Sequence, residues 1–100
     1  MSEVFVVAEI RITNPKSYAD YLPLSTASVE KFGGEFLVRG GRRVQKEGGD
    51  DLHCSQWRTV IVRFPNAETA SRWYDSQNYA TARTIRIANS DGRLFFVEGV

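Results

Sequence analysis

The sequence contains one cysteine and one histidine, the neighbours Cys54 and His53. A single cysteine excludes a disulfide within the chain and a metal cage of several thiolates, and it fits a reducing cytoplasm. One histidine leaves no second imidazole for a metal site within the chain. Because adjacent side chains of an extended segment point in opposite directions, the two residues form a poor nucleophile–base pair. A haem would need an axial histidine, and the loop position of His53 argues against one. We therefore expect no metal and no cofactor.

Net charge and long apolar runs are lacking too. The formal net charge is +1 at pH 7, which gives no bulk attraction to nucleic acid or to an anionic membrane. No apolar stretch approaches the roughly 20 residues that span a bilayer. The first residues, "MSEVFVVAEI", have no basic leader and predict a strand instead of a signal peptide. The glycine pairs do not open a helix after a strand, so they do not predict a phosphate-binding loop. We expect a cytoplasmic protein without nucleic-acid or membrane partners.

Four segments have the composition of strands. β-branched and aromatic residues dominate residues 4–12 and 57–64, and shorter apolar runs occupy residues 35–40 and 93–99. The polar residues 41–56 contain a glycine pair and predict a loop or a protruding hairpin. The strands are therefore separated by unequal connections, two of which are long enough to contain helices.

The first of these connections, residues 13–34, has signals for both ends of a helix. Asn14 can cap its start, and Pro15 suits the first helical position. Gly33 or Gly34 can adopt the left-handed conformation that ends a helix. Pro23 lies inside the span, removes one backbone hydrogen bond and is expected to kink or divide the helix.

The second connection predicts two helical segments and a turn. Residues 65–76 are expected to start at the cap Asn66, residues 77–88 restart after Ser76, and "SDG" predicts a turn before the last strand. The element order is β-α-β-β-α-β, which predicts an α+β ferredoxin-like fold with both helices on one face of the sheet. One hundred residues fit a single domain, residues 1–100.

The sheet face without helices is expected to be apolar and to need a partner. An exposed patch of this size is a liability in a monomer, and a second copy packed sheet to sheet would bury roughly 800 Å² per partner. We therefore expect a homodimer whose two sheets enclose a barrel. Alternation assigns these apolar residues to that face: Phe5, Val7, Leu37, Trp57, Ile61, Leu94 and Phe96.

Charged residues share the parity of that apolar face: Glu9, Arg11, Arg39, Arg63 and Glu98. A lone buried charge costs several kcal/mol, so these groups must pair with each other, meet water at a barrel mouth or bind a ligand. Gly40 and Gly41 follow Arg39 directly. They are expected to bend the chain and to leave space beside the arginine.

A set of short motifs carries a resemblance to a known family. The set comprises "KFGG", "RGG", "FP", "WYDS", "DGR" and the ending "VEGV". Together they resemble the domain-of-unknown-function 1330 family of the dimeric α/β-barrel superfamily, over nearly the whole chain. The resemblance implies a ferredoxin-like fold, a homodimer and a shared barrel, but no established activity. Relatives in the superfamily include cofactor-free monooxygenases, muconolactone isomerase-type enzymes, haem-dependent chlorite dismutases and stress-responsive proteins. The segment "EGGDDLHCSQW" is longer than the family's short link, so the resemblance does not imply the geometry of that hairpin.

Arg39 and Arg63 are the first candidates for a ligand site. A guanidinium is always charged and forks onto carboxylates, so the pair could fix an acidic small molecule. The alternative is that they pair with Glu9, with Glu98 or with the partner chain. The fold could also suggest an RNA-recognition domain, but such a domain needs aromatic residues on the middle strands, where this chain has Leu37, Arg39, Ile61 and Arg63.

Four further residues are candidates, each with a structural alternative. Tyr74 and Tyr79 could point to a pocket rim or belong to the core, as we expect for Trp73 beside them. Arg83 follows Tyr79 by four residues on the same helical face, where it could line the entrance or be solvated. Glu47 could reach across the dimer into the partner's site or be a solvated loop acid.

These observations favour a cofactor-independent enzyme, isomerase-like or monooxygenase-like, that acts on a small acidic organic molecule. Arg39 and Arg63 would hold the anion, and a carboxylate or a tyrosine would move the proton. The alternatives are a non-catalytic small-molecule-binding or stress-response dimer with the same chamber, and a purely structural role in which the charges set the register of the dimer.

Overall fold

A computed structural model describes residues 2–48 and 56–100. His53 and Cys54 lie outside the described residues. The four strands are β1 (Val4–Ile12), β2 (Glu35–Arg39), β3 (Trp57–Phe64) and β4 (Ser90–Glu98), and the helices are α1 (Pro15–Tyr18), α2 (Tyr21–Lys31), α3 (Ala67–Asp75) and α4 (Gln77–Asn89).

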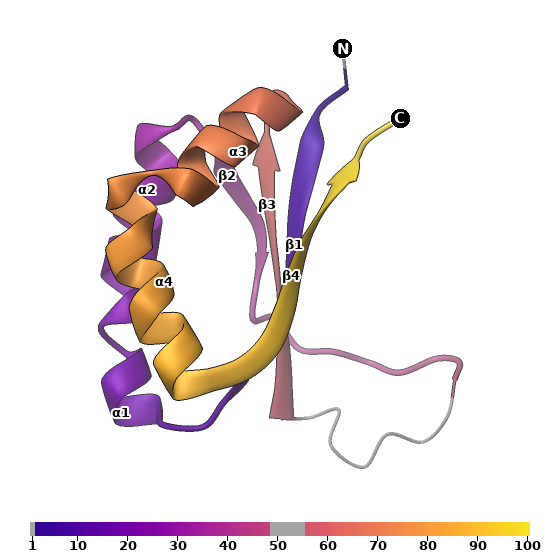
Figure 1. Ribbon diagram of the computed structural model, residues 1–100. Coiled ribbons are helices and arrows are strands. Elements are labelled where there is room, and N and C mark those ends of the chain that lie inside the picture. The colour runs from indigo at the N-terminus through magenta and orange to yellow at the C-terminus, as the bar shows by residue number, and fades with distance from the viewer. Residues whose placement is uncertain (1, 49–55) are drawn as a thin grey trace.

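The strands form one antiparallel sheet in the order β2-β3-β1-β4, and the helices cover one face of it (Figure 1). This confirms the predicted ferredoxin-like fold. No helix in the described part of the chain is long and apolar enough to cross a bilayer.

The helix ends follow the predicted local signals. The side chain of Asn14 accepts a hydrogen bond from the backbone nitrogen of Ser17, and Asn66 does the same for Thr69 at 2.8 Å. The predicted division of the helix is confirmed, because α1 ends at Tyr18 and α2 starts at Tyr21. The division lies before Pro23, which occupies the first turn of α2. A backbone N–H there would have no intrahelical partner, so the predicted loss of a hydrogen bond at Pro23 is wrong.

The core lies between the helix-covered face of the sheet and the helices. Trp73 is confirmed as a core residue: it is buried, and its indole nitrogen donates to the Ser28 hydroxyl at 3.1 Å. Its ring lies 5.3 Å from the ring of Phe64 on β3 and 4.2 Å from that of Tyr79 on α4, measured between centroids. The buried side chains on the strands are Val4, Val6, Ala8, Ile10, Val62 and Phe64.

The predicted turn at "SDG" is wrong, because β4 already begins at Ser90 and pairs with β1 along its whole length. Gly92 makes this pairing feasible. A Cβ at that position would lie 2.2 Å from the backbone oxygen of Glu9, which no side chain tolerates. The glycine is therefore a site of close strand approach, which local sequence does not distinguish from a turn.

The register of β4 against β1 also corrects the predicted faces of this strand. Leu94 pairs with Ala8 and Phe96 with Val6, so both belong to the helix-covered face. The ring of Phe96 accordingly packs edge-on against Tyr74. Glu98, which pairs with Val4, also belongs to the helix side and not to the opposite face.

A β-bulge in β2 moves Arg39 to the opposite face from the one predicted. Phe36 pairs with Val62, but Val38 pairs with Ile61 and Arg39 with Val60, so one residue of β2 has no counterpart on β3. An extra residue inverts the alternation beyond it. The prediction that Arg39 shares a face with Arg63 is therefore wrong, and Arg39 lies on the helix-covered face.

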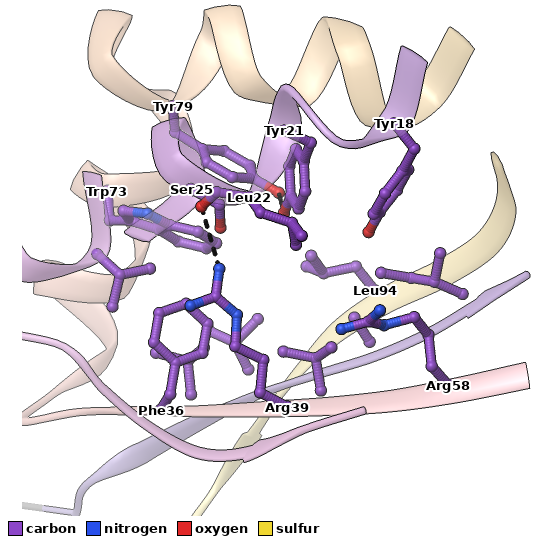
Figure 2. A pocket seen from close by; sticks show the side chains of 16 residues that line it. Tyr18, Tyr21, Leu22, Ser25, Phe36, Arg39, Arg58, Trp73, Tyr79 and Leu94 are labelled. Carbon is purple, nitrogen blue, oxygen red and sulfur yellow. Dashed lines mark hydrogen bonds between the residues drawn. The ribbon is translucent and has the colours of Figure 1, made fainter. Parts of the chain in front are cut away.

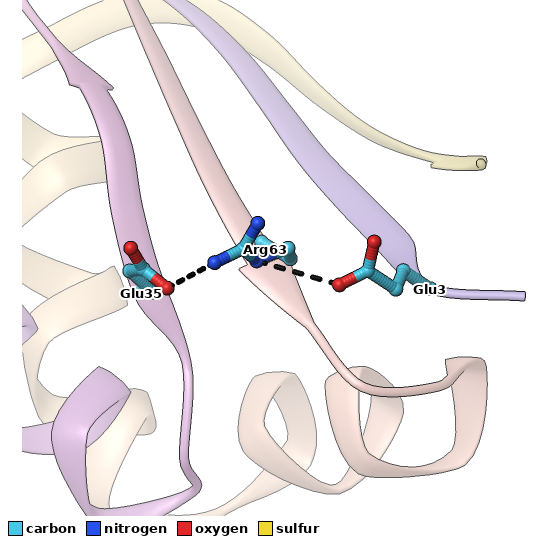
Figure 3. A network of polar contacts seen from close by, with 3 residues as sticks. All are labelled: Glu3, Glu35 and Arg63. Carbon is cyan, nitrogen blue, oxygen red and sulfur yellow. Dashed lines mark hydrogen bonds and ion pairs between the residues drawn. The ribbon is translucent and has the colours of Figure 1, made fainter.

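The charges that remain on the outer face, the one without helices, pair within the chain. Arg63 forms ion pairs with Glu35 and, at 3.4 Å, with Glu3 (Figure 3). Glu9 pairs with Arg93 at 3.2 Å. Arg11 and Asp91 form a similar pair at 2.6 Å. Pairing with each other, one of the three outcomes predicted for these charges, is wrong for the described residues, because each pairs with a charge outside the predicted set.

The outer face is otherwise apolar, as predicted. Pairing places Phe5 opposite Arg63, Val7 opposite Ile61 and Trp57 opposite Arg11, which confirms the expected parity of these residues. Phe95 and Val97 join them in place of Leu94 and Phe96, and they are 42% and 45% exposed. The outer face, meaning this surface of β1, β3 and β4, therefore retains a wide apolar area.

Candidate functional site

A cavity lies between the helix-covered face of the sheet and the first two helices (Figure 2). Its volume is about 420 Å³ with the open mouth included, of which about 20 Å³ admits the centre of a water-sized sphere. A ligand larger than water must therefore displace a side chain. The polar residues that line the cavity are Tyr18, Tyr21, Ser25, Arg39, Arg58 and Tyr79, and the apolar ones include Ile10, Val60, Val62, Leu94 and Trp73.

Arg39 covers this cavity from the edge strand β2. Its guanidinium carbon lies 4.0 Å from the ring centroid of Phe36, and its Nη2 donates to the backbone oxygen of Leu22 at 3.1 Å. The side chain is exposed, and no carboxylate of residues 2–48 or 56–100 forms an ion pair with it. One hydrogen bond to a carbonyl and one stacking contact hold it, so an anion can recruit it at small cost.

Arg58 of β3 supplies a second cation. Its guanidinium lies against Gly40, where an added Cβ would be 2.8 Å from Nη2. The space that the glycine leaves is thus beside Arg58, which corrects the predicted space beside Arg39. The Nε of Arg58 is buried and has no hydrogen-bond partner in the described structure. Figure 2 shows the Tyr18 hydroxyl directed toward this guanidinium.

Two buried tyrosines from different helices meet beside the cavity. The hydroxyls of Tyr21 on α2 and Tyr79 on α4 are 2.8 Å apart, and the Nε of Arg86 donates to the Tyr79 hydroxyl at 3.3 Å. All three side chains are buried. Burial raises the pKa of Tyr18, the third tyrosine of the cavity, to about 12, and it raises the pKa of Tyr79 as well. Tyr18 and Tyr79 are therefore neutral hydrogen-bonding groups at ordinary pH.

The raised pKa of Tyr18 predicts a loss of stability at alkaline pH. Because the folded-state pKa lies above the unfolded value of about 10, the unfolded chain releases its proton first and is favoured as pH rises from 10 to 12. We expect the free energy of unfolding to fall by about 1 to 2 kcal/mol across this window through Tyr18. Urea unfolding at pH 10, 11 and 12 measures it, and Tyr18→Phe should make the slope shallower. An unchanged slope in that variant would contradict the assignment.

Two of the seven predicted site residues, Arg39 and Tyr79, border the cavity, and five do not. Arg63 and Glu9 lie on the outer face, where acidic and basic neighbours pair with them. Glu47 is an exposed residue of the segment that follows β2.

Tyr74 and Arg83 are held by each other and do not line the cavity. Arg83 donates to the backbone oxygen of Tyr74 at 2.7 Å, and its guanidinium carbon lies 4.8 Å from the centroid of that ring. The pair therefore ties α3 to α4. In the residues that the structure describes, no group of three or more His, Cys, Asp or Glu side chains is arranged to hold a metal ion.

Sequence reasoning missed Arg58, Tyr21 and Arg86. Arg58 shares the parity of Val60 and Val62, and an arginine on such an apolar face is a signal that was present in the alternation. Arg86 follows Tyr79 by seven residues, two helical turns on the same side of α4. Tyr21 gave no signal, because its place on the apolar stripe is that of a core residue.

The comparisons with known proteins agree with this fold. The family model described as "Domain of unknown function (DUF1330)" matches residues 3–100. A comparison with curated protein sequences found no match.

Three solved structures illustrate the likeness. A protein of unknown function from Rhodopseudomonas palustris is 21% identical with a TM-score of 0.79, and 99% of this chain and 83% of that chain are covered. SnoaB, a cofactor-independent oxygenase from Streptomyces nogalater, is 11% identical with a TM-score of 0.73, and 100% and 95% are covered. An antibiotic biosynthesis monooxygenase is 17% identical with a TM-score of 0.58, and 97% and 98% are covered. At such identities the likeness concerns the fold alone.

Proposed function

The chain belongs to the DUF1330 family, and we propose that it binds a small organic anion in the cavity between its sheet and its helices. The observation that carries this proposal is the composition of the lining. Arg39 and Arg58 supply two cations, and none of the described residues that line the cavity is acidic. An anion would satisfy the buried Nε of Arg58, since an unpaired polar group in an apolar surrounding is costly.

The apolar part of the lining indicates the rest of the ligand. Aliphatic side chains of the central strands form one wall, and the aromatic rings of Phe36 and Trp73 stand beside it (Figure 2). Such walls favour a flat or unsaturated carbon skeleton. We therefore propose an aromatic or otherwise unsaturated acid of few heavy atoms.

We further propose that the protein acts on this molecule as a cofactor-independent enzyme, isomerase-like or monooxygenase-like. Fixed donors in a water-poor site stabilise negative charge that develops on a substrate oxygen. The fold of the cofactor-independent oxygenase SnoaB supports the reaction class by analogy. A non-catalytic binding protein is the second candidate, because the described lining contains neither a carboxylate nor a histidine that could act as a base near pH 7.

We propose that the working form is a homodimer joined through the outer face. The exposed Phe95 and Val97 would be covered there, and the charges of that face are already neutralised by their neighbours. In this arrangement each protomer keeps its own cavity on the side away from the interface.

A thermal-shift comparison of matched anions and amides tests the binding proposal. Benzoate, salicylate and cinnamate should raise the melting temperature, whereas benzamide, salicylamide and cinnamamide should not. At a hundred times its dissociation constant a ligand adds about 2.7 kcal/mol, which moves a domain of this size by roughly 10 °C or more. Equal responses to acid and amide, or none to either, would contradict an anion site.

Any anion that binds can then be used to decide whether the protein is an enzyme or a non-catalytic binding protein. Proton NMR in deuterated buffer reports exchange of acidic C–H groups, and an oxygen electrode reports oxygenation. Turnover in either assay that disappears in Arg39→Met supports the enzyme. Tight binding without turnover supports the non-catalytic candidate.

A further inference from the structure

We propose that Arg86, Tyr79 and Tyr21 form a directed hydrogen-bond chain that presents the Tyr21 hydroxyl as a donor to an oxyanion of the ligand. The proposal rests on the proposed function above, since it concerns the same cavity. It adds the class of the oxygen that is bound, a phenolate or enolate oxygen, and the residue that binds it.

The direction of the chain follows from the chemistry of its first member. A guanidinium has donors and no acceptor, so Arg86 can only donate to the Tyr79 oxygen, which lies 3.3 Å from its Nε. Tyr79 is 0% exposed, and Tyr21 is the acceptor for its hydroxyl among the described residues. If Tyr79 did not donate to Tyr21, its proton would be buried without a partner.

Tyr21 is consequently left with a proton to donate. Its oxygen accepts from Tyr79, and within residues 2–48 and 56–100 no other oxygen or nitrogen forms a hydrogen bond with its hydroxyl. The chain thus has three donors, the Arg86 Nε–H and the two hydroxyls, but only two acceptors, the two tyrosine oxygens. The one surplus donor belongs to Tyr21, which lines the cavity from α2. An oxygen atom of a ligand would complete the chain.

The chain is suited to an anionic oxygen. Hydrogen bonds in a chain polarise one another, so the donation by Arg86 strengthens that of Tyr79 and of Tyr21. Burial raises the pKa of Tyr79 and keeps that phenol protonated, so the negative charge stays on the ligand. The other charged or titratable groups of the lining are Tyr18, Arg39 and Arg58, and the two arginines favour the same charge.

4-Nitrophenol serves as the probe, because its phenol and phenolate forms absorb at different wavelengths. With the probe bound to the wild-type protein, absorbance against pH should give an apparent probe pKa below its value in water. Tyr21→Phe should bind the phenolate roughly 10-fold or more weakly, as expected for a lost hydrogen bond to a charged group, and should return the probe pKa toward the solution value.

The outer members of the chain distinguish polarisation from a structural role. Tyr79→Phe and Arg86→Met should each move the probe pKa in the direction of Tyr21→Phe, and the double variant should move it little further, because either change breaks the same chain. Arg86→Lys, which keeps a cation and donors, should restore part of the shift.

Tyr74→Phe is the matched control. The Tyr74 ring packs 5.7 Å from the Tyr79 ring, but its hydroxyl takes part in no hydrogen bond to a described residue. The variant should therefore bind the probe like the wild-type protein. If neither 4-nitrophenolate nor any carboxylate of the thermal-shift panel binds to the wild-type protein, the proposed function falls and the chain with it. If a carboxylate binds and 4-nitrophenolate does not, the chain alone is overturned. If 4-nitrophenolate does bind, and Tyr21→Phe leaves affinity and probe pKa unchanged, the chain alone is overturned.

Discussion

Arg39→Met is expected to weaken the binding of an organic anion by roughly 10- to 100-fold, and Arg63→Met is expected to leave it unchanged. A charge-assisted hydrogen bond contributes about 1.5 to 3 kcal/mol, which corresponds to this range. Arg39 stands over the cavity, whereas Arg63 lies on the outer face with two glutamates. Both are arginines of the same sheet, so Arg63→Met controls for the loss of one positive charge.

Isothermal titration with the best anion of the thermal-shift panel measures the effect, with each variant compared with its own ligand-free form. Methionine keeps the apolar stem of arginine, which limits the change in packing beside Phe36. Arg58→Met provides a second test from β3 and should also lose affinity. Loss of binding in Arg63→Met but not in Arg39→Met would show that the ligand sits on the outer face and that the cavity is only a packing defect.

Phe95→Glu is expected to convert a dimer into monomers without unfolding them. Phe95 is 42% exposed in the single chain, so glutamate there costs the fold little. A dimer would bury two added carboxylates in an apolar contact, at a cost of several kcal/mol. The dissociation constant should therefore rise by roughly 100-fold or more, as read by sedimentation or light scattering over a concentration series.

Ile87→Glu provides the control for this experiment. Ile87 is 61% exposed on α4, in the helix layer on the other side of the sheet, and should not affect association. If Phe95→Glu and Ile87→Glu had the same dimer dissociation constant, the outer face would be refuted as the interface. A wild-type protein that is already monomeric would refute it as well. Phe95→Glu should retain the anion site, because each cavity lies within one chain.

The predictions that were confirmed concern features that depend on residues close together in the sequence. Asn14, Asn66 and Ser76 cap the helices as expected because a cap is formed by a side chain and a backbone group three residues away. The element order followed from the strand composition and the helix signals, and the apolar outer face followed from the alternation of long strands such as β1. These features need no knowledge of the rest of the chain.

The errors have a common physical cause, which is the pairing of distant strands. Leu94 and Phe96 were assigned to the wrong face because their neighbours Phe95 and Val97 are apolar too, so only the register of β4 against β1 decides which pair faces the helices. Arg39 was assigned to the wrong face because a bulge in β2 adds one residue against β3. A shift by one residue inverts every side chain beyond it, and alternation alone does not locate a bulge.

The sequence by itself determined the element order, the ferredoxin-like fold, the helix ends and the family, because these depend on periodicity, capping and short motifs. Only the tertiary structure decided that Arg39 and Arg63 lie on opposite faces of the sheet. It also decided that Arg39 lines a cavity between sheet and helices together with Arg58, Tyr21 and Tyr79. The reason is that strand register and helix packing set which distant side chains share one space, and both depend on contacts between residues far apart in the chain.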